Sequence, residues 1–187
     1  VWQTGSGTQT NMNANEVISN YAIQILKGKI GSKSPIHPND HVNLSQSSND
    51  TFPTIMHISA NELTESKLIP ALKKLIMELK KKTISYSKIV KIGRTHTQDA
   101  TPLTMGDEFS GYLHQIENSF ERIKLAKKEL SYLAQGGTAV GSGINSPKYF
   151  DKIFCKFLNK FTINKYKPAK NKFEAIASHD SLVNFSN

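Results

Sequence analysis

Two long series of apolar residues at helical spacing constrain the fold of this chain more than any other feature. The first consists of Leu68, Leu72, Leu75 and Leu79, and the second of Phe109, Leu113, Ile116, Phe120 and Ile123. Steps of three and four residues place the side chains of each series on one face of a helix. The two series therefore predict two long helices, each with one face that has to be covered.

Helices of this length indicate an extended helical bundle. We predict that the first begins near Asp50, a good N-cap, with Pro53 in its first turn. The second is expected from about Thr104 to Ala134. Each would have roughly 30 residues and a length of about 45 Å. Two such helices cannot bury both apolar faces, so partner helices have to come from sequence outside this chain, from other subunits, or from both.

The rest of the chain predicts shorter elements, and the fold class is mainly α. Residues 11–26 have helical spacing, with an apolar stripe of Val17, Ile18, Ala22, Ile25 and Leu26. The other expected elements are loops at 1–10, 31–49, 93–102 and 138–147, a short strand at 88–92, a helix at 149–161, and a helix that begins near Ser178.

Composition excludes several classes of protein. The net charge is +9, but only Arg94 and Arg122 are arginines, whereas proteins that bind nucleic acids usually carry more arginine, with aromatic residues between the charges. We interpret the lysines as residues on solvent-exposed helix faces. The alternative is that their positive charge steers a dianionic substrate to the protein. One cysteine, Cys155, excludes an internal disulfide, and no apolar run is long enough to span a membrane.

Three polar segments are candidates for a ligand site. Residues 4–11 are rich in glycine and hydroxyl groups, which suit close approach to an anion, although an ordinary loop has the same composition. Residues 45–50 stand at the predicted helix start, where they could cap the helix or bind a carboxylate, and a second polar cluster, 37–40, precedes them. His96 in segment 93–102 has only polar neighbours, which suits a general acid or base, although a structural role is the alternative.

The order of these motifs resembles that of the fumarase/aspartase superfamily, and most closely that of the class II fumarases. The similar segments are Thr-Gly-Ser-Gly-Thr-Gln at 4–9, His-Pro-Asn-Asp at 37–40, Ser-Gln-Ser-Ser-Asn-Asp at 45–50, Gly-Arg-Thr-His at 93–96 and Gly-Gly-Thr-Ala-Val-Gly at 136–141. Aspartases typically have glutamine at the position of His96, so aspartate ammonia-lyase is a weaker alternative, and another lyase of the superfamily is a more distant one. A non-enzymatic relative, like the lens crystallins of this superfamily, is a further alternative, but its active-site residues would have eroded first.

The resemblance implies reversible hydration of fumarate to (S)-malate in the tricarboxylic acid cycle, through a carbanion. It implies a homotetramer whose active sites are shared between subunits, no metal or organic cofactor, no nucleic-acid or membrane partner, and a cytoplasmic location, or a mitochondrial one in a eukaryote. His96 would be catalytic. The residues implied to bind substrate are Ser6, Gly7, Thr8, Ser47, Ser48, Asn49 and Thr95. The residues that match a second dicarboxylate site are His37, Pro38, Asn39 and Asp40.

The resemblance also predicts how the chain is organised. Residues 1–49 would belong to an N-terminal lyase domain, and residues 50–187 would form the first part of the central long-helix domain. The sequence starts at Val1, and nothing in it matches the Gly-Ser-Ser loop that carries the family's serine base or the lysine that follows. We therefore expect a piece of a longer protein, without its C-terminal remainder and inactive alone.

Overall fold

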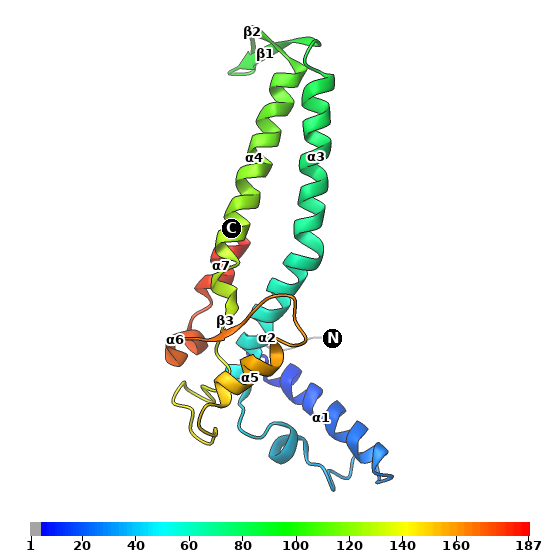
Figure 1. Ribbon diagram of the computed structural model, residues 1–187, viewed down its shortest axis with the longest axis vertical. Coiled ribbons are helices and arrows are strands. Elements are labelled where there is room, and N and C mark those ends of the chain that lie inside the picture. Colours follow the sequence, from blue (N-terminus) through cyan, green and yellow to red (C-terminus); the bar gives the residue numbers. More distant parts are fainter. Residues whose placement is uncertain (1–4) are drawn as a thin grey trace. The chain divides into compact units, whose positions relative to one another are not determined.

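The computed structural model describes residues 5–187, and the mainly α fold class is confirmed (Figure 1). The chain forms two compact units. The first comprises the chain up to Glu62 and from Glu129 to Asn187, and the second is Leu63–Lys128. The division predicted between residues 49 and 50 does not coincide with these limits, and the assignment to family domains stays a prediction. No helix within residues 5–187 combines the length and the apolar character that crossing a membrane requires.

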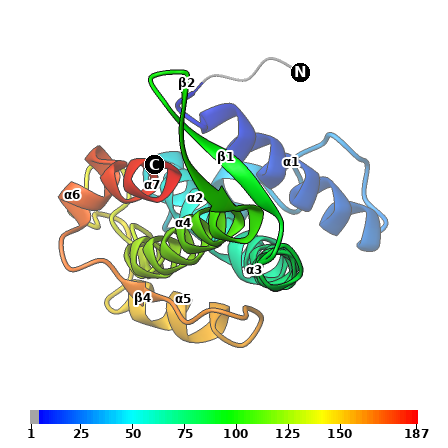
Figure 2. The same cartoon turned by 90° about the horizontal axis from the view of Figure 1, so that it is seen from above.

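The second unit is a pair of long helices joined by a β-hairpin. α3 (Ile69–Ser85) and α4 (Met105–Ala126) lie side by side along their length in both views (Figures 1 and 2). β1 (Val90–Thr95) and β2 (Gln98–Thr104) pair antiparallel between them. The strand expected at 88–92 is therefore confirmed with a shift of two residues, whereas the loop expected at 93–102 is wrong, because those residues form most of the hairpin.

The first long helix is continuous but not uniform. α2 (Ser48–Leu63) in the first unit is followed by the π-helical turn η2 (Thr64–Leu68), which leads into α3. The predicted N-cap was wrong by three residues. Ser47 caps α2, since its Oγ accepts the N–H of Asn49 at 3.2 Å, while Asp50 lies inside the first turn and its carboxylate accepts the N–H of Ser47 at 2.9 Å.

The second long helix begins as predicted and ends earlier. Thr104 caps α4 in a reciprocal capping box with Asp107. α4 ends at Ala126 instead of Ala134, because the 3₁₀ turn η3 (Glu129–Ser131) and the short strand β3 (Tyr132–Leu133) follow. Leu130 and Leu133 are fully buried in the first unit, and the chain leaves the helix to place them there.

The apolar faces of the helix pair are only partly covered. Phe109 packs edge-to-face on Tyr86 with ring centroids 5.3 Å apart. On α4, none of the five apolar residues from Phe109 to Ile123 is fully buried. On α3, Leu75 and Met77 remain 43% and 56% exposed. Two helices therefore leave apolar surface uncovered, in agreement with the sequence argument that partner helices are needed.

The first unit opens with α1 (Thr8–Ile25), which packs through a polar face. The helix begins three residues before the predicted start, directly after Gly7, whose φ is +76°. Its buried residues recur every fourth position and are Asn11, Asn15, Ser19 and Ile23. The predicted apolar stripe lies on the exposed side, where Val17 and Ile18 are 61% and 54% exposed.

The remaining elements of the first unit surround a small core of Leu133, Cys155 and Tyr166. The polar stretch 31–49 contains a π-helical turn, η1 (Pro38–Val42). The helix expected at 149–161 is α5 (Phe150–Leu158), and the one expected near Ser178 is α7 (Asp180–Ser186). α6 (Lys172–Ala177) and β4 (Lys167–Pro168), which pairs parallel with β3, were not predicted.

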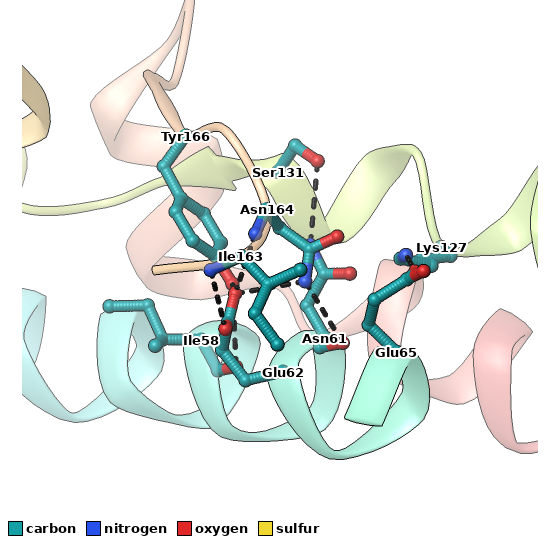
Figure 3. A network of polar contacts seen from close by, with 9 residues as sticks. All are labelled: Ile58, Asn61, Glu62, Glu65, Lys127, Ser131, Ile163, Asn164 and Tyr166. Atoms are coloured by element: carbon teal, nitrogen blue, oxygen red, sulfur yellow. Dashed lines mark hydrogen bonds and ion pairs between the residues drawn. The ribbon is translucent and has the colours of Figure 1, made fainter. Parts of the chain in front are cut away.

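Glu62, near the end of α2, anchors a loop one hundred residues further along the chain (Figure 3). Its carboxylate accepts the N–H groups of Ile163 and Asn164 at 2.9 and 3.0 Å. The Tyr166 hydroxyl donates to the same carboxylate at 2.8 Å, and its side chain is 1% exposed. Burial raises the pKa of Glu62, but these hydrogen bonds outweigh it and lower the pKa below its ordinary value.

Glu62→Gln in the whole protein is expected to destabilise the fold by about 1–3 kcal/mol, because an amide nitrogen then replaces one of the two carboxylate oxygens that accept the N–H groups of Ile163 and Asn164 and the Tyr166 hydroxyl. Denaturant unfolding measures this. Since the folded pKa is depressed, the wild-type advantage is present above the ordinary pKa of 4.5 and is lost as the pH falls through the folded value. Glu78→Gln on α3, which removes an exposed ion pair with Lys81, is the control, and its cost should be clearly smaller because water screens an exposed pair. Equal costs for both variants would contradict the prediction.

Candidate active site

At the start of α2, the side chains of Ser48 and Asn49 have hydrogen-bond partners outside the helix. The Ser48 Oγ accepts a hydrogen bond from the Asn11 Nδ2 at 2.8 Å, which directs the Ser48 hydroxyl proton elsewhere. The Asn49 Nδ2 donates to the carbonyl of Ala139 at 2.8 Å, so its side-chain oxygen is oriented as well. Backbone N–H groups at a helix N-terminus favour anions. This end of α2 is therefore suited to hold a carboxylate.

The polar face of α1 supports this arrangement. Asn11 and Asn15 are 8% and 7% exposed, and both donate to the Asn43 Oδ1, at 3.2 and 3.0 Å. Buried amides without partners would be costly, so these bonds fix the distance between α1 and the chain that enters α2. Sequence reasoning missed these residues. The available signal was the recurrence of short polar residues at every fourth position of a helix.

Asp50 connects the start of α2 to a distant turn. It is fully buried, and its Oδ2 accepts the N–H groups of Gly136 and Thr138 at 2.9 and 2.8 Å. Burial raises the pKa of this carboxyl, although the backbone donors from Ser47, Thr138 and Gly136 oppose the change. Sequence reasoning had treated Asp50 as a helix cap alone, because partners 86 and 88 residues away leave no local signal.

The Gly-rich segment reaches the same helix. Gly7 is buried, and a Cβ at this position would overlap the ring of Phe52 in the first turn of α2. Only glycine permits this approach together with the positive φ. The flanking Ser6 and Thr8 are exposed, and Thr8 is the first residue of α1. Thr4, the first residue of the motif, lies outside the described residues.

Thr95 and His96 lie in the other unit, at the tip of the hairpin. Thr95 pairs with Gln98, so His96 and Thr97 form a two-residue turn, and their φ angles of 49° and 62° are typical of a type I′ turn. Arg94 and Asp99 form an ion pair across the hairpin at 3.5 Å. His96 is exposed, and the paired strands on either side of the turn define its backbone position.

The cluster at 37–40 is built around one turn of π-helix. The His37 Nδ1 accepts the N–H of Asp40 at 3.1 Å, so the imidazole caps η1. The same nitrogen lies 3.2 Å from a carboxylate oxygen of Asp40. Asn39 and Asp40 are exposed, whereas Pro38 is buried. The cluster therefore stabilises the start of η1 through His37, and the amide of Asn39 and the carboxylate of Asp40 lie at the surface.

Within the first unit, the structure brings Ser6, Gly7 and Thr8 and the residues Ser47, Ser48 and Asn49 to the two N-terminal helix ends. The turn at 136–139 is bonded to the start of α2 through Asp50 and Asn49. Thr95 and His96 belong to the second unit. Among residues 5–187, no group of three or more His, Cys, Asp or Glu side chains has an arrangement that could hold a metal ion.

Comparison with known proteins identifies the family. The sequence model of a lyase family matches residues 1–187. The chain is 60% identical over 186 residues to a class II fumarate hydratase of Rickettsia bellii and 59% identical over 183 residues to fumarate hydratase class II 2 of Bradyrhizobium diazoefficiens. These matches cover 100% and 98% of this chain but 40% and 39% of the relatives. The chain thus spans about two fifths of their length.

The fold comparison agrees. The crystal structure of recombinant class II fumarase from Schistosoma mansoni has a TM-score of 0.91 and 46% identity, with 99% of this chain and 42% of that chain covered. A fumarate lyase:delta crystallin structure from Brucella melitensis, bound to cobalt, has a TM-score of 0.90 and 36% identity, with 98% and 40% covered. The chain therefore belongs to the lyase family and, within it, to the class II fumarases.

Proposed function

We propose that the whole protein containing this chain is a fumarate hydratase that interconverts fumarate and (S)-malate. The observation that carries the proposal is the start of α2, where the Asn11 Nδ2 donates to the Ser48 Oγ at 2.8 Å and so leaves the Ser48 hydroxyl proton to donate to another group at the helix N-terminus. A four-carbon dicarboxylate offers carboxylates that such neutral donors bind without a compensating cation. The relatives at about 60% identity carry the name fumarate hydratase, which supports this substrate.

The residue types suit the chemistry of this reaction. When the C3 proton of malate leaves, the electron pair spreads into the adjacent carboxylate, and fixed neutral donors stabilise the added charge. The residues proposed to bind the carboxylates are Ser6, Gly7, Thr8, Ser47, Ser48, Asn49 and Thr95. The C2 hydroxyl then departs as water and needs a proton, which we assign to His96. The base that removes the C3 proton is expected outside this chain.

The assembly and the second site are part of the same proposal. We propose a homotetramer in which loops of different subunits complete each active site, so that His96 of the hairpin serves a site together with loops like those of the first unit. The exposed side chains of Asn39 and Asp40 support a second dicarboxylate site formed by His37, Pro38, Asn39 and Asp40. The related bacterial enzymes support a cytoplasmic location, and a mitochondrial one would apply in a eukaryote.

The substrate is tested directly with the whole protein. We expect malate to be converted to fumarate, followed by ultraviolet absorbance, and aspartate to be deaminated at no more than about one hundredth of that rate. The reason is that His96 stands where aspartases typically carry glutamine, and a site whose polar groups suit one leaving group discriminates against another. The matched measurement is ammonia release from aspartate under the same conditions. Comparable rates would contradict the assignment, and inactivity towards both substrates would favour a non-enzymatic relative.

A further inference from the structure

We propose that Asp50 is a positioning residue of the dicarboxylate site, and this inference rests on the proposed function. Its two carboxylate oxygens have different hydrogen-bond partners. Oδ1 accepts the N–H of Ser47 at 2.9 Å and so completes the cap of α2. Oδ2 accepts the N–H groups of Gly136 and Thr138, at 2.9 and 2.8 Å. The side chain joins the proposed carboxylate-binding turn to a second, glycine-rich turn.

The arrangement is more than a helix cap. α4 offers a direct comparison, because Asp107 occupies the same third position and bonds back to its cap residue, Thr104, at 2.9 Å. Asp107 is exposed and, among residues 5–187, its carboxylate bonds only back to Thr104 in that first turn, whereas Asp50 is fully buried and has partners 86 and 88 residues away. A helix can be capped by an exposed carboxylate, which stays in contact with water. A buried carboxylate loses its hydration and is stable only where several donors bind it.

The far side of the connection also touches the proposed binding residues. The Asn49 Nδ2 donates to the carbonyl of Ala139, one residue beyond the turn that Asp50 holds. Thr138 has a φ of 56°, an uncommon conformation for a β-branched residue, and its N–H bond to Asp50 stabilises it. If the turn moves, the acceptor for Asn49 moves with it. Asp50 therefore fixes the orientation of Asn49 as well as the N–H groups beside Ser47.

The experiment uses the whole protein and compares Asp50→Asn with Asp107→Asn. The probe is succinate, a saturated four-carbon dicarboxylate that binds without reacting, measured as a competitive inhibitor of malate conversion. We expect Asp50→Asn to raise both the Ki of succinate and the KM of malate about tenfold, equivalent to ~1.4 kcal/mol. Asp107→Asn should leave both within about twofold. A merely structural role would reduce the amount of active enzyme, and hence Vmax, without changing Ki.

The possible outcomes separate this inference from the proposed function. A wild-type protein that neither converts malate nor binds succinate overturns both. A wild-type protein that does so, together with an Asp50→Asn variant that has normal Ki and KM, overturns only the positioning role. If Asp50→Asn is insoluble, Asp50→Glu keeps the charge and moves it by one methylene. A raised Ki in that variant supports the inference, and an unchanged Ki overturns it.

Discussion

Replacement of His96 by asparagine in the whole protein is expected to lower kcat by a factor of about 10² to 10⁴, the usual scale for the loss of a general acid or base. Asparagine suits the test because His96 has a φ of 49°, a backbone conformation that asparagine adopts readily. The hairpin turn should therefore persist while the titratable imidazole is lost. The measurement is the steady-state rate of malate dehydration, with size-exclusion chromatography to show that the assembly is unchanged.

The control for this variant is His114→Asn. His114 is an exposed histidine on α4, in the same unit, and has no place in the proposed site. Its replacement should leave kcat within about twofold, since surface substitutions away from special features are usually small in effect. If His96→Asn retains a rate similar to that of His114→Asn, His96 is a turn residue and the proton donor has to be sought elsewhere.

The sequence allowed the prediction of elements whose signals are local. Thr104 and Asp107 stand three residues apart before an amphipathic run, and α4 begins there with both bonds of the capping box. The end of α4 was not predictable in the same way. Leu130 and Leu133 fit a helical pattern, yet they are fully buried in another unit of the chain, and this tertiary demand overrides the local periodicity.

The sequence singled out candidate site residues, whose role in binding stays a prediction, but it did not indicate how they are arranged. The polar motifs identified Ser47, Ser48 and Asn49 before any coordinates. The partner that orients Ser48 is Asn11, 37 residues earlier, and nothing in the spacing indicates that contact. The hairpin that carries His96 was missed because its two-residue turn, His96-Thr97, lacks the Asn-Gly or Asp-Gly sequence that usually marks a type I′ turn.

The 187-residue chain by itself is expected to aggregate or to form a loosely packed helical species without hydratase activity. Large apolar side chains remain exposed on the helix pair, among them Leu75 at 43%, Met77 at 56% and Leu125 at 62%. Each large side chain left in water forgoes up to about 1.5–3 kcal/mol of burial. Several such losses are comparable with the total stability of a typical domain, about 5–15 kcal/mol.

This expectation is measured on the purified chain by size-exclusion chromatography, circular dichroism during thermal unfolding, and the malate assay. The whole protein serves as the control, because partner helices would cover the same faces there and the serine base and lysine would be present. Adding a separately produced C-terminal piece should restore part of the activity if the active sites are assembled from several chains. A monodisperse 187-residue chain that unfolds cooperatively and converts malate alone would contradict both the argument from exposed surface and the proposal of a base outside the chain.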